Sequence, residues 1–369
     1  MNSLRLSENI AIMRKNAGIT QDELAAFLGV TKASVSKWEN GQSMPDILFL
    51  PELATYFDLS VDELLGYEPQ LSKEQIQKLY RELGEGFANL PFDEVFARCE
   101  VLVKKYYSCY RFLLQICALW VNHYMLVEER ERQLEILEKA ISLCEHIMEK
   151  CKETELCSDA KGMKATIDIL CGRPQDVIDG IEESLNPNRI LNQSEGLLLH
   201  AYMMVGDTEK ANSFAQISMY HHLIALIGDA VNYLNMHMQD KEICAETIRR
   251  IDQLIEAFKL DALDLNVIAI YQYQVAVYYA IAGDNMEAIK RLQNYAKTVL
   301  ALLHCGVLHG DTYFTKLDAW FEQLDLGSQM PRSKKLILEN ARENLNNPLF
   351  AGIQEMEEFS TIRRMLEEG

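Results

Sequence analysis

Residues 20–41 carry the pattern that most constrains the fold of this chain, because they fit two short helices joined by one tight turn. Thr20 and Glu23, three positions apart, form a capping box at the start of the first helix. Gly29 suits the left-handed residue that ends this helix, and Thr31 suits the cap of the next one. The spacing therefore predicts a helix, a sharp turn and a second helix within this one segment.

The apolar residues of the segment predict how the two helices pack. Ala25 is small at the position where the second helix must cross the first closely. Val35 and Trp38 lie one turn apart on the second helix and are expected to face inward. The remaining side chains of that second helix are then left on its outer surface.

Similar start and stop signals predict three more helices around this pair. One is expected near residues 7–16 and a short one near residues 60–66. Pro45 and Asp46 are expected to open the third. Its apolar stripe would consist of Ile47, Leu50, Leu53, Ala54 and Phe57. The first 68 residues therefore predict a five-helix domain.

A domain boundary is expected at residues 66–69, because Pro69 stops the preceding helix and Ser72 caps the next one. The rest of the chain reads as helix almost throughout, with few prolines and no run of β-branched alternation. We therefore predict an all-α chain with domains at residues 1–68 and 69–369.

The second region contains a weak internal repeat. Turn residues recur 34 positions apart at Gly172, Gly206 and Asp240, and Gly283 follows 43 positions later. Five positions after these turns stand the small residues Val177, Ala211, Ala245 and Ala288. Four positions before them stand Asp168, Tyr202, Met236 and Tyr279. Asp168 departs most from the pattern, because a carboxylate is a poor filler of an apolar gap. The spacing resembles degenerate tetratricopeptide repeats, helix pairs stacked into an α-solenoid with a concave face.

Composition and motifs argue against a membrane protein and against an enzyme. The apolar stretches 112–127 and 267–283 are interrupted by polar residues, and the N-terminus lacks the apolar core of a secretion signal. Nine cysteines in so large a chain fit reduced thiols in a cytoplasm. No nucleotide-binding, zinc-protease or esterase motif is present, and the spacing of Cys144, Cys151 and Cys157 matches no zinc site. We expect a cytoplasmic protein with no catalytic residues, cofactor or metal.

Residues 1–66 resemble the Cro/lambda-repressor, or XRE-type, helix-turn-helix DNA-binding domains. The resemblance rests on the segment 20–41 and on the Leu-Ser-Val-Asp-Glu-Leu-Leu ending at residues 59–65. It implies that the second helix of the pair reads base edges in the major groove of double-stranded DNA through Lys32, Ala33 and Lys37. The full set of candidate DNA contacts is Gln21, Thr31, Lys32, Ala33, Ser34, Ser36, Lys37 and Asn40.

Within this set, the resemblance puts Gln21 and Asn40 at positions that contact phosphates. It also puts Arg14 and Glu39 where related domains hold a partly buried, structural ion pair. For Lys32 and Lys37 the alternative is an ordinary solvated lysine on a surface helix. Ala33 can touch a thymine methyl group but forms no hydrogen bond with a base.

Net charge limits how strongly such a domain binds DNA. The chain has 36 Lys and Arg against 55 Asp and Glu, a net charge of −19, but a whole-chain charge describes solubility rather than one binding face. Residues 1–68 alone have a net charge of −5, so one copy neutralises few phosphates. We therefore expect a homodimer that reads an imperfect palindrome, with half-sites about 34 Å apart or a small multiple of that distance.

The two regions together resemble the peptide-responsive regulators of Gram-positive bacteria, the group containing Rgg, PrgX and PlcR. The resemblance implies that the helical region dimerises, and that a short signalling peptide in its groove changes the spacing or freedom of the two DNA-binding domains. Counting from the turn residues predicts that Gln193, His200, Met203, Leu234 and His237 face the groove, joined by Tyr273 from a helix rich in tyrosine and glutamine.

Two alternatives remain at this point. The tyrosines of the helix around Tyr273 also suit packing within the repeat core. The whole chain also suits a protein-interaction scaffold that is tethered to DNA and has no small effector.

Overall fold

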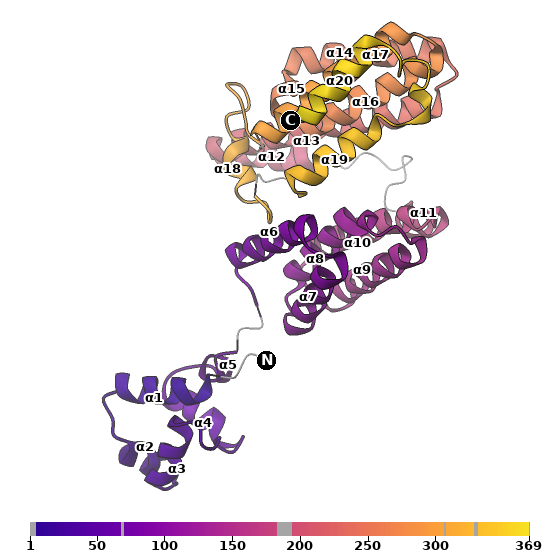
Figure 1. Ribbon diagram of the computed structural model, residues 1–369. Coiled ribbons are helices and arrows are strands. Elements are labelled where there is room, and N and C mark those ends of the chain that lie inside the picture. The colour runs from indigo at the N-terminus through magenta and orange to yellow at the C-terminus, as the bar shows by residue number, and fades with distance from the viewer. Residues whose placement is uncertain (1–4, 68–69, 183–193, 306–307, 328–330, 369) are drawn as a thin grey trace. The chain divides into compact units, whose positions relative to one another are not determined.

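The computed structural model describes residues 5–67, 70–182, 194–305, 308–327 and 331–368, and within these ranges it contains helices and no strands (Figure 1). The all-α prediction is therefore confirmed. By its internal contacts the chain divides into two compact units. The first consists of residues 1–72 and 101–113, and the second of residues 73–100 and 114–369.

Five helices form the N-terminal part of the first unit, as predicted. They are α1 (Leu6–Asn16), α2 (Gln21–Leu28), α3 (Lys32–Glu39), α4 (Phe49–Tyr56) and α5 (Val61–Leu65). Their shared core consists of Leu6, Ile10, Leu24, Ala25, Leu28, Val35, Trp38, Leu53, Ala54 and Leu64. The Thr20–Glu23 capping box is present, and Gly29 ends α2 in the left-handed region at φ 67°. Local signals thus set the ends of the two helices that matter most.

The start of α4 differs from the sequence-based prediction. The helix begins at Phe49 rather than at Pro45 and Asp46, and Ile47 is 75% exposed instead of part of an apolar stripe. Asp46 accounts for the difference, because its carboxylate accepts a hydrogen bond from the backbone N–H of Leu48 at 3.0 Å. This turn ahead of the helix points Ile47 away from the core.

The rest of the chain is built from helices of varied length. They are α6 (Lys73–Asn89), α7 (Phe92–Lys105), α8 (Tyr110–His123), α9 (Arg130–Lys150), α10 (Thr154–Leu170), α11 (Pro174–Ile181), α12 (Ser194–Met204), α13 (Thr208–Met236), α14 (Lys241–Phe258), α15 (Leu260–Leu263), α16 (Leu265–Ala282), α17 (Asn285–Cys305), α18 (Leu317–Phe321), α19 (Lys334–Asn344) and α20 (Glu357–Glu368). Two short 3₁₀ turns, η1 (Tyr124–Leu126) and η2 (Pro348–Phe350), complete the described elements.

Neighbouring helices of this region pack in pairs, with α9 on α10, α12 on α13 and α16 on α17. Gly172, Gly206 and Gly283 lie in the turns after α10, α12 and α16, at φ 76°, 77° and 78°. The three predicted glycine turns are therefore confirmed. Asp240 acts differently, because its carboxylate caps α14 by accepting from the backbone N–H groups of Glu242 and Ile243.

Of the small residues predicted to follow the turns, Ala211 and Ala288 are buried, but Ala245 is exposed. The prediction for Ala245 is wrong because the inward stripe of α14 is set one residue earlier. That stripe consists of Cys244, Ile248, Ile251 and Ile255. The small side chain at 245 therefore faces solvent rather than a neighbouring helix.

Asp168 is buried despite its charge. Its carboxylate lies 2.8 Å from Lys164 Nζ and 3.0 Å from an Arg173 guanidinium nitrogen. Two cations thus compensate for the loss of water around the carboxylate. The position that the repeat pattern assigns to an aromatic ring is filled here by an ion-pair network.

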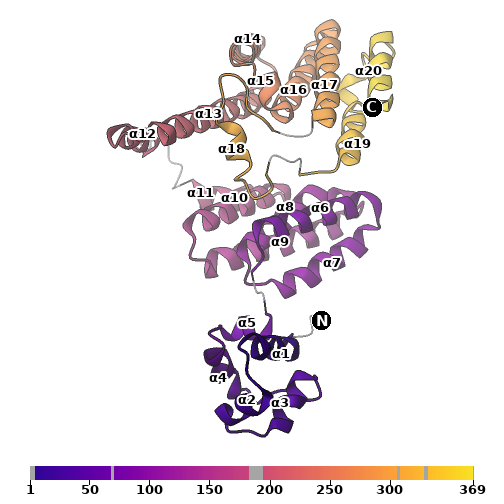
Figure 2. The ribbon, with the colours of Figure 1, turned by 90° about the vertical axis from the view of Figure 1, so that its left-hand side faces the viewer.

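Helix α16 is central to the C-terminal part of the region. Two of its faces are apolar and buried, one packing with α13, α14 and α18 and the other with α17, α19 and α20. Figure 2 shows α16 between α15 and α17, with α20 beyond. Within the described residues, no helix is both long and apolar enough to cross a lipid bilayer.

Candidate nucleic-acid interface and helical-region pocket

Helix α3 divides cleanly into a buried and an exposed side. Val35 and Trp38 are in the core, whereas Lys32, Ala33 and Lys37 are exposed. A helix period of 3.6 residues produces this separation. Three candidate base-reading side chains therefore share the solvent side of one short helix, which packs against α2.

Thr31 and Ser34 mainly organise the start of α3. The Thr31 hydroxyl accepts a hydrogen bond from the backbone N–H of Ser34 at 3.2 Å and lies 2.9 Å from the Ser34 hydroxyl. At the other end of α3, the Asn40 amide donates to the backbone carbonyl of Ser36 at 2.8 Å. These four polar candidates thus lie close to the two ends of the exposed face.

A bidentate ion pair joins α1 to α3. Arg14 donates from Nε to Glu39 Oε1 at 2.5 Å and from Nη2 to Oε2 at 3.1 Å. A third Arg14 nitrogen donates to the carbonyl of Ile19 at 2.7 Å. The two side chains are only 13% and 7% exposed. Burial raises the pKa of Glu39, but hydrogen bonds from Arg14 and Gln21 outweigh it, so this pKa lies below its ordinary value.

Gln21 takes part in the same network, which its position in the sequence did not reveal. Its side-chain amide donates to Glu39 Oε2 at 2.8 Å, from α2 to the end of α3. The amide that was expected to meet a phosphate is thus engaged inside the domain. The backbone N–H groups of Gln21 and Asp22 lie in the first turn of α2, where a helix offers no internal acceptor.

The two exposed lysines of α3 differ in their partners. Lys32 Nζ lies 2.7 Å from Asp22 Oδ2, and both side chains are more than half exposed. Lys37 has no ion-pair partner among the residues that the structure describes. Because water screens an exposed pair, Asp22 competes only weakly for Lys32.

The predicted effector groove is not assembled from the predicted residues. Gln193 lies outside the described residues. His200 and Met203 are exposed on α12, and His237 ends α13 with its ring 4.5 Å from the Tyr233 ring. The prediction for Leu234 is wrong, because this side chain is completely buried in the core.

The burial of Leu234 follows from the inward stripe of α13. That stripe recurs at intervals of three or four residues and consists of Leu223, Ile227, Ala230 and Leu234. Counting from the turn thus placed the concave face on the wrong side of this helix.

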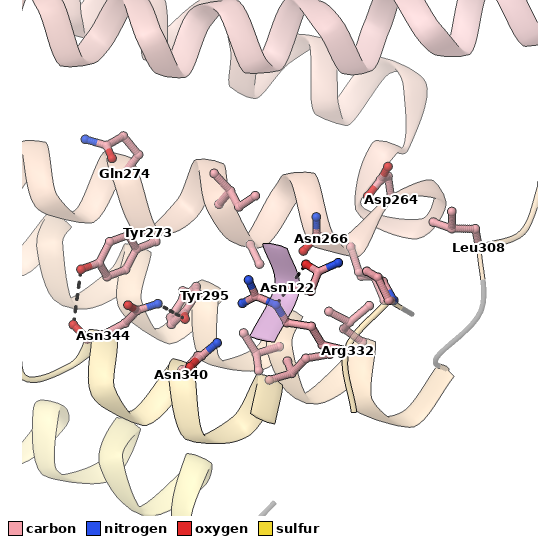
Figure 3. Close-up of a pocket in the computed structure, with 18 of the residues that line it drawn as sticks. Asn122, Asp264, Asn266, Tyr273, Gln274, Tyr295, Leu308, Arg332, Asn340 and Asn344 are labelled. Atoms are coloured by element: carbon pink, nitrogen blue, oxygen red, sulfur yellow. Dashed lines mark hydrogen bonds between the residues drawn. The ribbon is translucent and has the colours of Figure 1, made fainter. Parts of the chain in front are cut away.

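Tyr273 does line a cavity, of about 850 Å³, in the second unit. The cavity is formed largely by α16, α17 and α19, with Asn122 and Arg332 also in its wall (Figure 3). The Tyr273 hydroxyl accepts from the Asn347 amide at 2.9 Å and donates to the carbonyl of Asn344 at 3.4 Å. The Asn344 amide in turn donates to the Tyr295 hydroxyl at 3.0 Å.

The wall of this cavity is rich in amides and phenols. Besides the residues just named, it includes Asn266, Gln274 and Asn340. Sequence reasoning pointed to Tyr273, Gln274 and Asn122 as residues that could line a groove. It missed Asn266, Asn340, Asn344 and Arg332, because no local pattern marks them. Among the described residues no cluster of three or more histidine, cysteine or carboxylate side chains is arranged to hold a metal ion.

Comparison with known proteins agrees with the geometry of the N-terminal helices. Residues 10–64 match the family model for a helix-turn-helix domain. The chain is 28% identical over 83 residues to the HTH-type transcriptional activator BcrR of Enterococcus faecalis. The aligned segment covers 21% of this chain and 41% of that protein. It is 32% identical over 63 residues to the cryptic phage CTXphi transcriptional repressor RstR of Vibrio cholerae, covering 17% of this chain and 56% of the other.

The chain therefore spans only about half the length of these curated relatives. Among solved structures, the apo form of the competence regulator ComR from Streptococcus vestibularis aligns with this chain at 13% identity. The alignment covers 87% of this chain and 97% of the ComR chain. Its TM-score of 0.27 is too low to establish a common fold. Residues 10–64 are a helix-turn-helix domain, which confirms the resemblance seen in the sequence.

Proposed function

We propose that this chain is a sequence-specific DNA-binding transcriptional regulator. The observation that carries the proposal is the exposed face of α3, which presents Lys32, Ala33 and Lys37 directly after the turn of a helix-turn-helix domain. In this motif the second helix enters the major groove, and its exposed side chains meet base edges there. The two lysines suit guanine, and Ala33 suits the methyl group of thymine.

Phosphate contacts are proposed to flank this reading face. Since the Gln21 side chain is bound to Glu39, the backbone N–H groups at the start of α2 are the better donors to a phosphate oxygen. Asn40 remains a candidate phosphate contact at the far end of α3. Thr31, Ser34 and Ser36 lie beside the two lysines and are proposed to contact DNA at the edge of the reading face. The Arg14–Glu39 pair keeps a structural role and touches no nucleotide.

The helical region is proposed to hold a homodimer, with the chain organised as domains 1–68 and 69–369. Exposed apolar side chains on α12, on α13 and in the turn between them support this proposal. Met204 is 82% exposed and Met236 is 72% exposed, and Leu197 and Val205 are also well exposed. Exposed apolar surface of this kind is typical of an interface with a partner. Two copies would double the number of phosphates that a domain of net charge −5 can engage.

The same region is proposed to sense an effector, most simply a short linear peptide, in the cavity beside Tyr273. Amides and phenols in the wall suit a peptide backbone, and the apolar side chains of α16 and α17 suit its side chains. Binding regulates only if the peptide favours one arrangement of the dimer over another, with a coupling of about 1 to 3 kcal/mol. Such a regulator works in the cytoplasm, where its DNA is.

Selection of bound fragments from random DNA with the full-length protein tests the core of this proposal. We expect an enriched imperfect palindrome, because two reading helices related by symmetry read the same half-site twice. A variant with both Lys32→Ala and Lys37→Ala is the control, since these exposed side chains contribute little to folding. If wild-type protein and this variant enrich the same fragments, or neither enriches any, the assignment of α3 as the reading helix fails.

Mass spectrometry of the protein isolated from its host tests the effector proposal separately. A retained oligopeptide supports peptide sensing. A stoichiometric protein partner in place of a peptide contradicts it and favours a DNA-tethered scaffold.

A further inference from the structure

Arg332 is placed unusually for an arginine of this chain. It lies just before α19 and forms part of the wall of the 850 Å³ cavity. Its Nε donates to the side-chain oxygen of Asn122 at 3.3 Å, and this is the single hydrogen bond of its side chain among the described residues. The side chain is only partly buried, and neither of its other two nitrogens is among the buried polar atoms that lack partners.

No carboxylate neutralises Arg332 within ion-pair distance in the described part of the chain. Its charge interacts with the phenols of Tyr80 and Tyr124 and with the imidazole of His123. Burial lowers the pKa of Arg332, an effect that these phenols only partly oppose. Because a guanidinium stays protonated in proteins, the side chain remains a cation facing the cavity.

The contrast with Arg291 shows what a satisfied arginine looks like in the same region. Arg291 is buried, but two of its nitrogens lie 2.5 and 2.9 Å from the carboxylate oxygens of Asp252. The pKa of Arg291 is raised, since this pairing outweighs the effect of burial. The geometry of the Arg291 fork is that of a bidentate carboxylate complex. Arg332 has the same fork and lacks such a partner.

Two amides next to Arg332 are also without partners. Asn266 at the start of α16 and Asn340 on α19 line the cavity, and neither side chain has a hydrogen bond to another described residue. Figure 3 shows Asn266, Asn340 and Arg332 around the cavity, with Asn122 next to Arg332. A cation and two amides thus face one space from two stretches of the chain, the start of α16 and the stretch that includes α19.

We propose that this cavity binds a ligand through a free carboxylate, which pairs with the Arg332 guanidinium. Asn266 and Asn340 supply amide hydrogen bonds to the polar atoms next to that carboxylate. A carboxylate fits better than a phosphate dianion, because Arg332 is the only guanidinium among the described residues of the wall, which also carries Asp264 and Glu343. The inference rests on the proposed effector-sensing function and assigns the chemical group that is recognised.

The carboxylate has two conceivable sources, the C-terminus of a linear peptide and a small carboxylic acid. Affinity selection with mass spectrometry separates them, with full-length protein as the bait. The probes are a library of short linear peptides with free C-termini, the same library with amidated C-termini, and N-acetyl-leucine. Amidation removes the negative charge and leaves the rest of each peptide unchanged.

We expect wild-type protein to retain free-acid peptides and to reject their amides. Arg332→Met is expected to weaken retention by about tenfold or more, and Arg332→Lys by less, because lysine keeps the charge without the fork. Arg250→Met is the matched control, since Arg250 is exposed on α14 and pairs with Glu246 outside the cavity. The melting temperature of each variant verifies that it is folded.

Retention of N-acetyl-leucine alone assigns a small acid as the source and keeps the carboxylate site. Equal retention of acids and amides overturns the inference, as does equal retention by wild type and a folded Arg332→Met variant. Retention of no probe by the wild type overturns it as well. Selection of random DNA does not depend on any of these results, so failure here is distinguishable from failure of the proposed DNA-binding function.

Discussion

The helix-turn-helix domain and the helical region place their candidate functional residues in opposite ways. In the domain, all candidate DNA contacts lie between Gln21 and Asn40, on two adjacent helices and the turn between them. In the helical region, the wall of the cavity extends from Asn122 to Asn344 along the chain. A surface built from one short segment is visible in the sequence, whereas a cavity built from distant helices exists only after folding.

The two regions also handle charge differently. Glu39 is nearly buried and accepts hydrogen bonds from both Arg14 and Gln21, so its carboxylate is paired within the domain. Arg332 is half buried and left without a carboxylate among the described residues. The first arrangement stabilises a fold, and the second leaves binding capacity for a ligand.

Removal of the Glu39 carboxylate should have the largest effect. In Glu39→Ala, Arg14 and the Gln21 amide lose their shared partner in a nearly buried site, which should cost about 3 kcal/mol of domain stability. Hydrogen exchange of the α1–α3 amides in the full-length protein measures this loss. Asp22→Ala is the control, because it breaks an exposed pair and should change stability by about 0.5 kcal/mol or less. Equal effects of the two substitutions would contradict a structural role for Glu39.

Enlargement of a buried alanine should come next. Ala288 is completely buried after the turn at Gly283, so Ala288→Leu should overpack the α16–α17 contact and cost about 2 kcal/mol. Ala245 holds the equivalent sequence position but is exposed, and Ala245→Leu should leave stability nearly unchanged. Thermal unfolding followed by far-UV circular dichroism compares the two. A larger loss at 245 than at 288 would show that the helical pairing is different.

Loss of the unpaired lysine should affect DNA binding rather than stability. Lys37→Ala should weaken binding to the selected operator by about 1 to 2 kcal/mol and relax the preference at one base pair. Lys32→Ala should cost less, because Asp22 already offsets part of the Lys32 charge. Titrations against operator variants at one fixed salt concentration measure both effects. Unchanged preference in Lys37→Ala would exclude Lys37 as a base reader.

The smallest expected effect is a gain. Asp22→Asn frees Lys32 from an exposed ion pair, so DNA binding should strengthen by about 0.2 to 1 kcal/mol. Asp58→Asn removes the same charge between α4 and α5 and controls for the change in net charge. An equal gain in both variants would mean that Asp22 acts through net charge alone.

Helix ends and turns were predictable because their signals are local. The Thr20–Glu23 capping box and the glycine turns at 172, 206 and 283 each depend on residues within a few positions of one another. The exposed face of α3 followed from the same short segment. The fold class and the helix-turn-helix domain were therefore accessible from sequence.

The remaining features depend on contacts that no spacing rule encodes. Gln21 meets Glu39 18 residues away, and a hydrogen bond of the Asp46 side chain turns Ile47 out of α4. Leu234 and Ala245 were misplaced because an error of one residue rotates a helical side chain by about 100°. Arg332 stands out because no carboxylate among the described residues pairs with it, and only the folded structure shows this.

The attachment of three helices to one carboxylate also bears on the energetics of DNA recognition. Glu39 on α3 holds Arg14 of α1 and Gln21 of α2, so the reading helix is fixed before any duplex arrives. Association then orders few additional backbone bonds and forfeits little entropy. Calorimetric titration should accordingly give a heat-capacity change that scales with the contact area alone, without the excess that accompanies coupled folding.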